Sequence, residues 1–318
     1  MKTQAVVISQ PGQVALQEVA LRTPGPDDVV IQTAYTSISA GTERMLLNGQ
    51  MPHPMLQLPV VPGYETVGRI VEIGDNVSKD WRDRWVYVGG ALCYEGVNAA
   101  WGGQAATLFT DVKRVIPLDD VEPRHGVLLA LAATSLHGVD VLQPQPADRV
   151  LVIGQGPVGQ LTARLLSGRD AWVAVADRSA ARLAFSEGDM VINVNDQSLT
   201  DKITEPVSAI VEASGSMAAL ASALPLLANG GTILLLGYYD KLDIPYMPLF
   251  LKEARLLTAK EWADGDLLRC RDLIATGKLD VGALLTHDLP ISSVDSAYQT
   301  ALNDMDCLKL VLDWSKQN

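Results

Sequence analysis

The sequence predicts an α/β protein built from a β-rich domain and a second domain with a doubly wound parallel sheet. Its 318 residues exceed what one hydrophobic core usually spans, so two domains are expected. Before about residue 120 short strand-like runs dominate, whereas afterwards strand and helix patterns alternate around a glycine-rich turn. We therefore expect domains at 1–120 and 121–258, with residues 259–318 returning to the first domain.

The first domain is predicted from short apolar and β-branched runs that are separated by turn residues. Gly12, Pro24 and Gly74 lie between such runs and favour tight turns. Helical periodicity is scarce in this part of the chain, so the domain is predicted to be β-rich. The predicted strands are residues 4–8, 14–19, 29–34, 67–73, 85–88 and 107–115.

The second domain is predicted from strand-like and helical patterns that alternate along the chain. Apolar residues recur at helical spacing from 125 to 142, and Pro144 and Pro146 end that helix. Strands are predicted at 150–153, 172–176, 191–194, 209–212 and 232–236, with an edge strand at 256–259. Helices are predicted at 158–166, 179–187 and 217–227. Strands that alternate with helices imply a parallel sheet.

The tail has a mixed pattern that is typical of a segment returning to the first domain. A helix at 262–276 is capped by Gly277, and a second helix is predicted at 294–302. The first helix leads into the segment 284–289, and a final strand is predicted at 309–312.

A glycine-rich turn joins the strand at 150–153 to the helix that follows. The pattern is G-x-G-x-x-G: the first glycine permits the tight turn, the second lets a pyrophosphate approach, and the third lets helix and strand pack closely. The helix N-terminus then points backbone amides at phosphate groups. The turn predicts a dinucleotide site formed by Gly154, Gln155, Gly156, Pro157, Val158 and Gly159.

Asp177 ends the next predicted strand and favours NAD over NADP. An acid at this position accepts hydrogen bonds from ribose hydroxyls and repels a 2′-phosphate. Arg178 follows directly and would soften that preference. Ala213 and Gly237, which follow two later strands, complete the predicted cofactor-binding residues.

Composition excludes several classes of protein. The formal net charge of −12 argues against a nucleic-acid partner and against an anionic membrane surface. No stretch approaches the apolar length of a membrane span, and residues 1–10 do not resemble a signal peptide. Three widely separated cysteines fit reduced thiols, which indicates a cytoplasmic location.

Several motifs together resemble the medium-chain dehydrogenase/reductase superfamily, and the resemblance runs from end to end. Residues 63–68, Gly-Tyr-Glu-Thr-Val-Gly, are similar to that family's G-H-E-x-x-G, while Asp148-Arg149-Val150 and Gly230-Gly231-Thr232 precede strands as they do in the family. The resemblance implies a GroES-like catalytic domain, a Rossmann domain, an NAD-dependent oxidoreductase activity and a homodimer paired through the edge strand at 256–259.

Residues 1–7, 38–43 and 61–65 are similar, more narrowly, to the superfamily members of bacteriochlorophyll synthesis. That similarity alone implies a tetrapyrrole substrate, whose 3-(1-hydroxyethyl) group would be oxidised to acetyl. Two alternatives stay open: a quinone oxidoreductase-like or polyol dehydrogenase using NAD(P)H, and a non-catalytic binding subunit.

The zinc ligands of the metal-dependent relatives are missing from the matching positions. Ser39 and Ala40 precede the Gly-Thr-Glu turn where the family has cysteine, Tyr64 replaces its histidine, and residues 130–133 offer no cysteine. Zinc needs three soft or nitrogen protein ligands plus water, and these are absent, so we expect no metal.

The matching positions also supply the candidate catalytic residues, which are Tyr64, Glu65, Glu43, Ser39, Thr42 and His137. Tyr64 would donate a hydrogen bond or relay a proton, or else fill the vacant metal pocket as a buried aromatic. Structural roles are the alternatives for Glu65 and His137, and a surface position is the alternative for Glu43. Three apolar groups would line a substrate cleft, or else pack in the protein core: the apolar residues of 45–58, Trp101, and the pair Tyr238–Tyr239.

Overall fold

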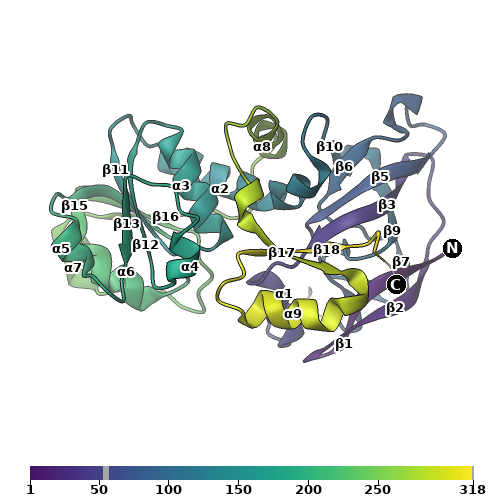
Figure 1. Cartoon of the computed structure of the whole chain (residues 1–318), viewed down its shortest axis with the longest axis horizontal. Helices are drawn as coiled ribbons and strands as arrows, with labels where there is room; N and C mark the ends of the chain where they lie inside the picture. The colour runs from purple at the N-terminus through teal and green to yellow at the C-terminus, as the bar shows by residue number, and fades with distance from the viewer. Residues whose placement is uncertain (53–56, 317–318) are drawn as a thin grey trace. The chain divides into compact units, whose positions relative to one another are not determined.

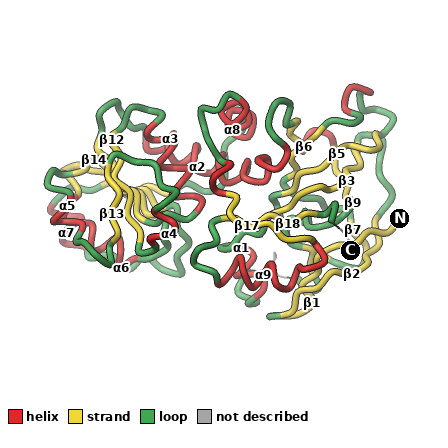
Figure 2. The backbone as a smooth tube through the Cα atoms, in the orientation of Figure 1, coloured by secondary structure: helices red, strands yellow, loops and turns green. Residues whose placement is uncertain are grey.

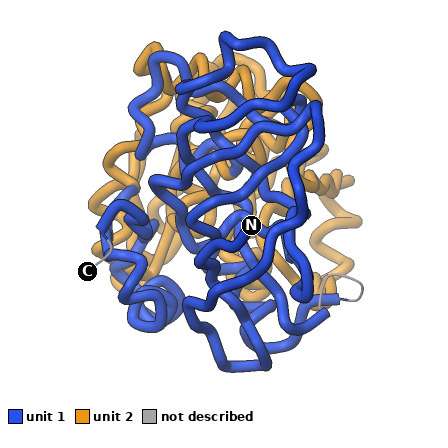
Figure 3. Tube along the Cα trace, turned by 90° about the vertical axis from the view of Figure 1, so that its right-hand side faces the viewer, with its two compact units in different colours: residues 1–130, 285–318 blue, residues 131–284 orange. Residues whose placement is uncertain are grey.

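The computed structural model describes residues 1–52 and 57–316. It divides into two compact units, which we call the β unit (residues 1–130 and 285–318) and the α/β unit (residues 131–284) (Figure 3). Residues 259–284 group with the α/β unit, whereas the sequence placed them in the returning tail. The reason is visible in the ion pair between Arg269 and Asp140, whose atoms lie 2.6 Å apart. The exact domain limits stay a prediction.

The β unit contains two sheets, and its strands far outnumber its helices (Figure 2). Its elements are β1 (Lys2–Gln10), β2 (Gln13–Leu21), β3 (Asp28–Ser37), α1 (Thr42–Leu47), β4 (Val60–Val61), β5 (Thr66–Ile73), β6 (Trp85–Val88), β7 (Tyr94–Glu95), β8 (Asn98–Ala99), β9 (Thr107–Asp111), β10 (Val115–Pro117), β17 (Leu285–Pro290), α9 (Val294–Asn303) and β18 (Lys309–Asp313). Single 3₁₀ turns complete the unit at Lys79–Trp81, Val112–Arg114, Pro123–Leu128 and Ile291–Ser293.

Strand β3 organises the larger sheet, whose order is β10-β6-β5-β3-β18-β17 with β9 also paired to β3. The smaller sheet has the order β7-β2-β1-β4-β8. Alternating apolar residues of the two sheets, such as Val7, Ile31, Ile70 and Val86, are buried together in one core.

The returning tail supplies two strands to this sheet. β18 pairs antiparallel with β3, so that Val311 lies opposite Ser37 and Asp313 opposite Tyr35. A second core forms where α9 packs, and it includes Tyr298, Leu312 and Ile38. The tail therefore brings its side chains next to the end of β3, immediately before Ser39.

The α/β unit alternates strands with helices as predicted. Its elements are α2 (Leu129–Leu142, which begins at the unit boundary), β11 (Arg149–Ile153), α3 (Pro157–Ser167), β12 (Trp172–Asp177), α4 (Ala180–Leu183), β13 (Met190–Asn193), α5 (Leu199–Lys202), β14 (Val207–Glu212), α6 (Met217–Ala223), β15 (Leu227–Leu235), α7 (Tyr246–Leu251), β16 (Arg255–Thr258) and α8 (Asp266–Ala275), with 3₁₀ turns at Leu224–Leu226 and Gly282–Leu284.

The six strands are parallel and follow the order β13-β12-β11-β14-β15-β16. Helix α3 lies on one side of the sheet, and α5, α6 and α7 lie on the other (Figure 1). This is the doubly wound order in which β11 and β14 flank the point where the connections reverse. Ligands of such sheets bind at the carboxyl ends of the strands beside that point.

Several predicted element ends were wrong. The helix predicted at 179–187 is only α4, because the Gln160 side chain donates to the Arg182 carbonyl at 2.9 Å and the Arg164 guanidinium to the Phe185 carbonyl at 3.0 Å. The helix predicted at 217–227 stops at Ala223, since Pro225 lies in a 3₁₀ turn and β15 already begins at Leu227. The short helices α1, α5 and α7 were not predicted.

One apolar stretch corrects the expectation about membrane spans. Within the described ranges, residues 123–142 are long and apolar enough by length and composition to cross a membrane, with a mean hydropathy of 1.4. The structure buries 61% of its most apolar window. Such burial is typical of the core helix of a globular protein.

Candidate active site

The glycine-rich turn follows β11 and leads into α3. Gly154 has a φ of +91°, and a Cβ there would lie 2.6 Å from the Ser214 nitrogen. A Cβ at Gly159 would lie 1.8 Å from the Gly154 oxygen, so the helix can approach the turn only without a side chain. At Gly156 a Cβ would meet no atom within 4 Å. This open position precedes Pro157 at the first turn of α3, where backbone amides are free to face an anion.

Asp177 stands directly beside this turn at the end of β12. Its two carboxylate oxygens accept hydrogen bonds from the Gln155 amide at 2.6 Å and the Ser179 amide at 2.8 Å. Each oxygen keeps capacity for a further hydrogen bond, as a ribose hydroxyl would require. Arg178 is exposed, and its carbonyl accepts a hydrogen bond from the Asn195 side chain at 2.9 Å.

The carboxyl ends of β14 and β15 carry the other two predicted cofactor positions. Ala213 follows β14, and Gly237 follows the end of β15. The buried Glu212 carboxylate links these ends, because it accepts the Ser214 amide at 2.8 Å and also receives the Tyr239 hydroxyl. Sequence reasoning missed Glu212, although an acid ending a strand just before a glycine turn would have indicated it.

Five of the six predicted catalytic residues come together in the β unit. The Tyr64 hydroxyl lies 2.7 Å from Ser39 Oγ and also interacts with the Thr42 side chain. The Tyr87 hydroxyl donates to the Tyr64 carbonyl at 2.7 Å and so fixes its backbone. Tyr64 and Thr42 are half-buried, whereas Ser39 is buried.

Burial, followed by the nearby Glu65 carboxylate, raises the pKa of the Tyr64 phenol above its ordinary value of 10. The hydrogen bonds from Ser39 and Thr42 lower that pKa by less. The phenol is therefore neutral at physiological pH and has a proton to donate.

Glu43 is fully buried and not at the surface. Its carboxylate accepts the Ser39 amide at 3.1 Å, the Gln104 side chain at 3.4 Å and the Tyr298 hydroxyl. Burial raises the pKa of this carboxyl from 4.5 to about 7, against the lowering effect of the Tyr298 hydrogen bond. The sequence did not indicate the partners Gln104 and Tyr298.

Glu65 forms a buried ion pair with Lys309, and the two side chains are 1% and 2% exposed. Ser37 donates a further hydrogen bond to the same carboxylate oxygen, and Lys309 also donates to the Ile38 carbonyl at 3.2 Å. The second oxygen of Glu65 is buried without a hydrogen-bond partner among the described residues. The pair ties the returning tail to the segment that carries Tyr64.

The remaining predicted positions lie elsewhere. His137 belongs to the α/β unit, where its Nδ1 lies 3.7 Å from the buried Asp266 carboxylate. Within the apolar segment of 45–58, the side chains of Leu46, Leu47 and Met51 are buried in the core, so these three are packing residues. Met55 and Leu56 of that segment lie outside the described residues.

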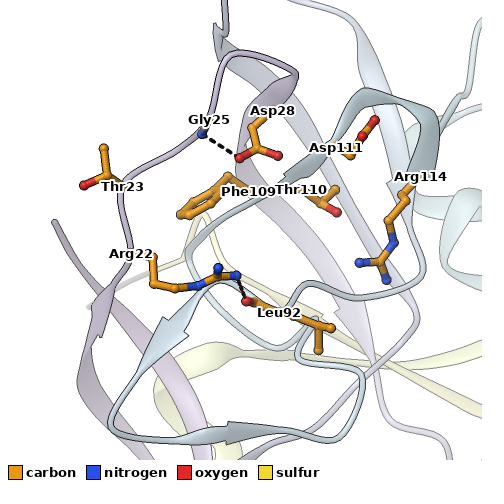
Figure 4. A pocket seen from close by; sticks show the side chains of 9 residues that line it. All are labelled: Arg22, Thr23, Gly25, Asp28, Leu92, Phe109, Thr110, Asp111 and Arg114. Carbon is orange, nitrogen blue, oxygen red and sulfur yellow. Dashed lines mark hydrogen bonds between the residues drawn. The ribbon is translucent and has the colours of Figure 1, made fainter.

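A hollow of about 420 Å³ lies at the opposite end of β3 (Figure 4). Arg22, Asp28, Phe109 and Arg114 are among its lining residues, and no predicted site residue takes part. Asp28 and Ser37 lie at the two ends of one strand, which places them about 30 Å apart. The hollow is therefore separate from the cluster around Tyr64.

Comparison with known proteins identifies the family that has this combination of units. Residues 157–261 match the family described as zinc-binding dehydrogenase, and residues 25–120 match the alcohol dehydrogenase GroES-like domain. The chain is 38% identical to a 2-desacetyl-2-hydroxyethyl bacteriochlorophyllide A dehydrogenase from Cereibacter sphaeroides and 36% identical to one from Rhodobacter capsulatus, in both cases over 99% of each chain. The protein belongs to the medium-chain dehydrogenase/reductase superfamily. The resemblance expected from the sequence is thereby confirmed, together with an oxidoreductase activity of the alcohol dehydrogenase type.

Solved structures of other dehydrogenases have the same fold. An alcohol dehydrogenase from Escherichia coli CFT073, complexed with NADH, has a TM-score of 0.87 at 22% identity and covers 98% of this chain and 99% of its own. A structure from Sinorhizobium meliloti 1021, bound to NADP, has a TM-score of 0.85 at 22% identity with the same coverage. The neighbours thus share a nicotinamide dinucleotide and differ in which one they bind.

Superfamily members described as zinc-binding need a set of metal ligands, and the residues present here do not fit one. Tyr64 and Ser39 are bonded to each other, and the Glu65 carboxylate is already paired with Lys309. Across residues 1–52 and 57–316, no group of three or more His, Cys, Asp or Glu side chains is arranged to hold a metal ion. We therefore derive no catalytic step through zinc.

Proposed function

We propose that the protein oxidises the 3-(1-hydroxyethyl) group of a chlorophyllide or bacteriochlorophyllide to a 3-acetyl group, with NAD as the oxidant and without zinc. The full-length likeness to two bacteriochlorophyllide dehydrogenases is the observation that carries the substrate class. The substitution of Tyr64 and Ser39 for metal ligands supports the zinc-free chemistry.

The choice of NAD is supported by the carboxylate of Asp177 beside the open turn. Its two oxygens are oriented by backbone amides, so the negative charge is fixed where a 2′-phosphate would have to bind. When bound, the nicotinamide accepts a hydride from the carbinol carbon.

Tyr64 is the residue that we propose to handle the hydroxyl proton. Its neutral phenol accepts the proton of the substrate alcohol while passing its own proton to Ser39 Oγ, 2.7 Å away, and Ser39 in turn releases its hydroxyl proton to water, so that both hydroxyls end neutral. In the reverse direction the same phenol donates a proton to the ketone oxygen. Glu65, held by Lys309, positions the segment of Tyr64 and does not contact the substrate in this proposal.

The outer edge of the parallel sheet offers a surface for assembly. β16 is an edge strand with an exposed Leu256, and the neighbouring helix α7 exposes Tyr246 and Phe250. An unpaired apolar edge is a natural pairing surface, so we propose a homodimer through β16. Light scattering that gives a monomer at micromolar concentration would contradict it.

The three cysteines form no disulfide, which supports a cytoplasmic location.

The function is tested by mixing the purified protein with a 3-(1-hydroxyethyl) chlorophyllide and either NAD⁺ or NADP⁺. We expect a red shift of the pigment's long-wavelength band that advances with NADH formation, and a much slower reaction with NADP⁺. An unchanged pigment, with turnover of a quinone or a polyol instead, would contradict the substrate class. Cofactor binding without any turnover would favour a binding subunit.

A further inference from the structure

Trp101 adopts an unusual backbone conformation next to Tyr64. Its φ is +67°, in the left-handed region that large side chains avoid at a cost of about 1–2 kcal/mol. Among the described non-glycine residues with positive φ, the others are Asp, Gln, Ala and Glu, so Trp101 is the one aromatic member. The half-buried indole packs in part against the core that includes Tyr298 and Leu312. A strained conformation that is kept beside a candidate active site is a reason to consider a functional role as well.

Tight glycine contacts hold Trp101 in place. Its carbonyl accepts the Ala91 amide at 2.7 Å, and a Cβ at Gly90 would lie only 2.2 Å from that same carbonyl oxygen. On its other side, Gly102 has a φ of +77°, and Gly103 donates to the Gly63 carbonyl at 2.7 Å. The segment is thus clamped between the turn at Gly90 and the residue that precedes Tyr64.

The clamp places the indole against the ring of Tyr64. The ring centroids lie 5.3 Å apart with an interplanar angle of 59°, within the usual range for interacting aromatic side chains. Tyr64 and Trp101 are both half-buried, so this aromatic pair borders the solvent.

We propose that Trp101 is a substrate-specificity residue, on whose indole face a flat conjugated macrocycle stacks while its alcohol contacts the Tyr64 hydroxyl. The inference rests on the proposed function. In such a substrate the carbinol carbon is attached directly to the ring edge, so the surface that holds the ring must adjoin the residue that holds the hydroxyl. Trp101 adjoins Tyr64 in this way. Flat conjugated rings stack favourably on aromatic side chains.

The test measures equilibrium binding of the pigment by fluorescence quenching in Trp101→Leu and Trp101→Phe, which share the same backbone strain and differ in aromaticity. We expect Trp101→Leu to weaken Kd about tenfold and Trp101→Phe to retain most of the affinity. KM should rise with Kd while kcat changes little, and NADH binding should not change. Trp101→Asn, whose side chain tolerates a positive φ, replaces the leucine variant if that variant does not fold.

Trp81→Leu is the matched control, because Trp81 is also half-buried in the β unit but packs against another core and Arg84. Equal pigment affinity in Trp101→Leu and the wild type would overturn the inference, as would an equal loss in the leucine and phenylalanine variants. Pigment that binds through Trp101 but is never oxidised would contradict the proposed function alone. A wild type that binds no pigment would overturn both.

Discussion

Tyr64 is the residue on which the proposed chemistry depends. Tyr64→Phe removes the hydroxyl that lies 2.7 Å from Ser39 Oγ and leaves the ring contact with Trp101 in place. Because proton transfer by a positioned side chain contributes roughly 10²–10⁴-fold, we expect kcat to fall by about 100-fold or more while pigment Kd stays nearly constant. Steady-state kinetics with parallel binding measurements check this result. A kcat within a few-fold of the wild type would exclude Tyr64 as the proton relay.

Glu43 gives the fold a specific pH dependence. Since its carboxyl has a pKa of about 7 when folded and near 4.5 when exposed, the folded state holds an extra proton between these values. Stability from this group is therefore full below pH 4.5 and declines as pH rises to about 7, by at most roughly 3 kcal/mol. Glu43→Gln should remove this slope. Urea unfolding at pH 5 and pH 8 measures it, and parallel slopes for variant and wild type would contradict the prediction.

Among the secondary-structure elements, the turn between β11 and α3 contains one glycine needed for packing and another needed for cofactor binding. Gly159→Ala puts a methyl group 1.8 Å from a backbone oxygen, whereas Gly156→Ala puts one in open space. We expect Gly159→Ala to lower the thermal unfolding temperature clearly and Gly156→Ala to leave it unchanged. Gly156→Ala should instead weaken NADH binding at least several-fold, because the methyl group lies where a pyrophosphate approaches. Calorimetric titration checks this, and wild-type affinity in Gly156→Ala would place the phosphates elsewhere.

Elements with a strong local pattern were predictable, and those determined by distant contacts were not. The alternation around residues 149–177 predicted β11, α3 and β12 because each carries its own periodicity and glycine signals. The end of α4 was not predictable, since it depends on side chains of α3 that bond to its carbonyls. α1 is only six residues long and has no amphipathic period to detect.

In the molecule as a whole, the parts of the candidate site that depend on distant contacts were likewise not predictable. Residue types at the family positions predicted the cluster of Ser39, Thr42, Glu43, Tyr64 and Glu65, which the structure brings together. Lys309 and Tyr298 were missed because they come from the far end of the chain and no local signal marks them. Trp101 was only an open alternative, since a left-handed conformation cannot be inferred for tryptophan from its neighbours.

Lys309 tests whether the returning tail stabilises the β unit through the site. Lys309→Met leaves the Glu65 carboxylate buried and unpaired, so we expect a loss of about 3–5 kcal/mol in the free energy of unfolding. Lys241→Met is the control, because the Lys241–Asp243 pair is 75% and 76% exposed and should contribute less than about 1 kcal/mol. Chemical unfolding measures both. Equal losses in the two variants would show that the buried pair has no special role.

We propose that this superfamily member oxidises a macrocyclic alcohol with NAD and Tyr64 and without zinc. The most direct measurement is the rate of pigment oxidation by one preparation before and after exhaustive chelation, with its metal content determined in parallel. We predict an unchanged kcat in protein that holds no stoichiometric zinc. A rate that disappears with the metal and returns when zinc is added back would contradict a zinc-free reaction.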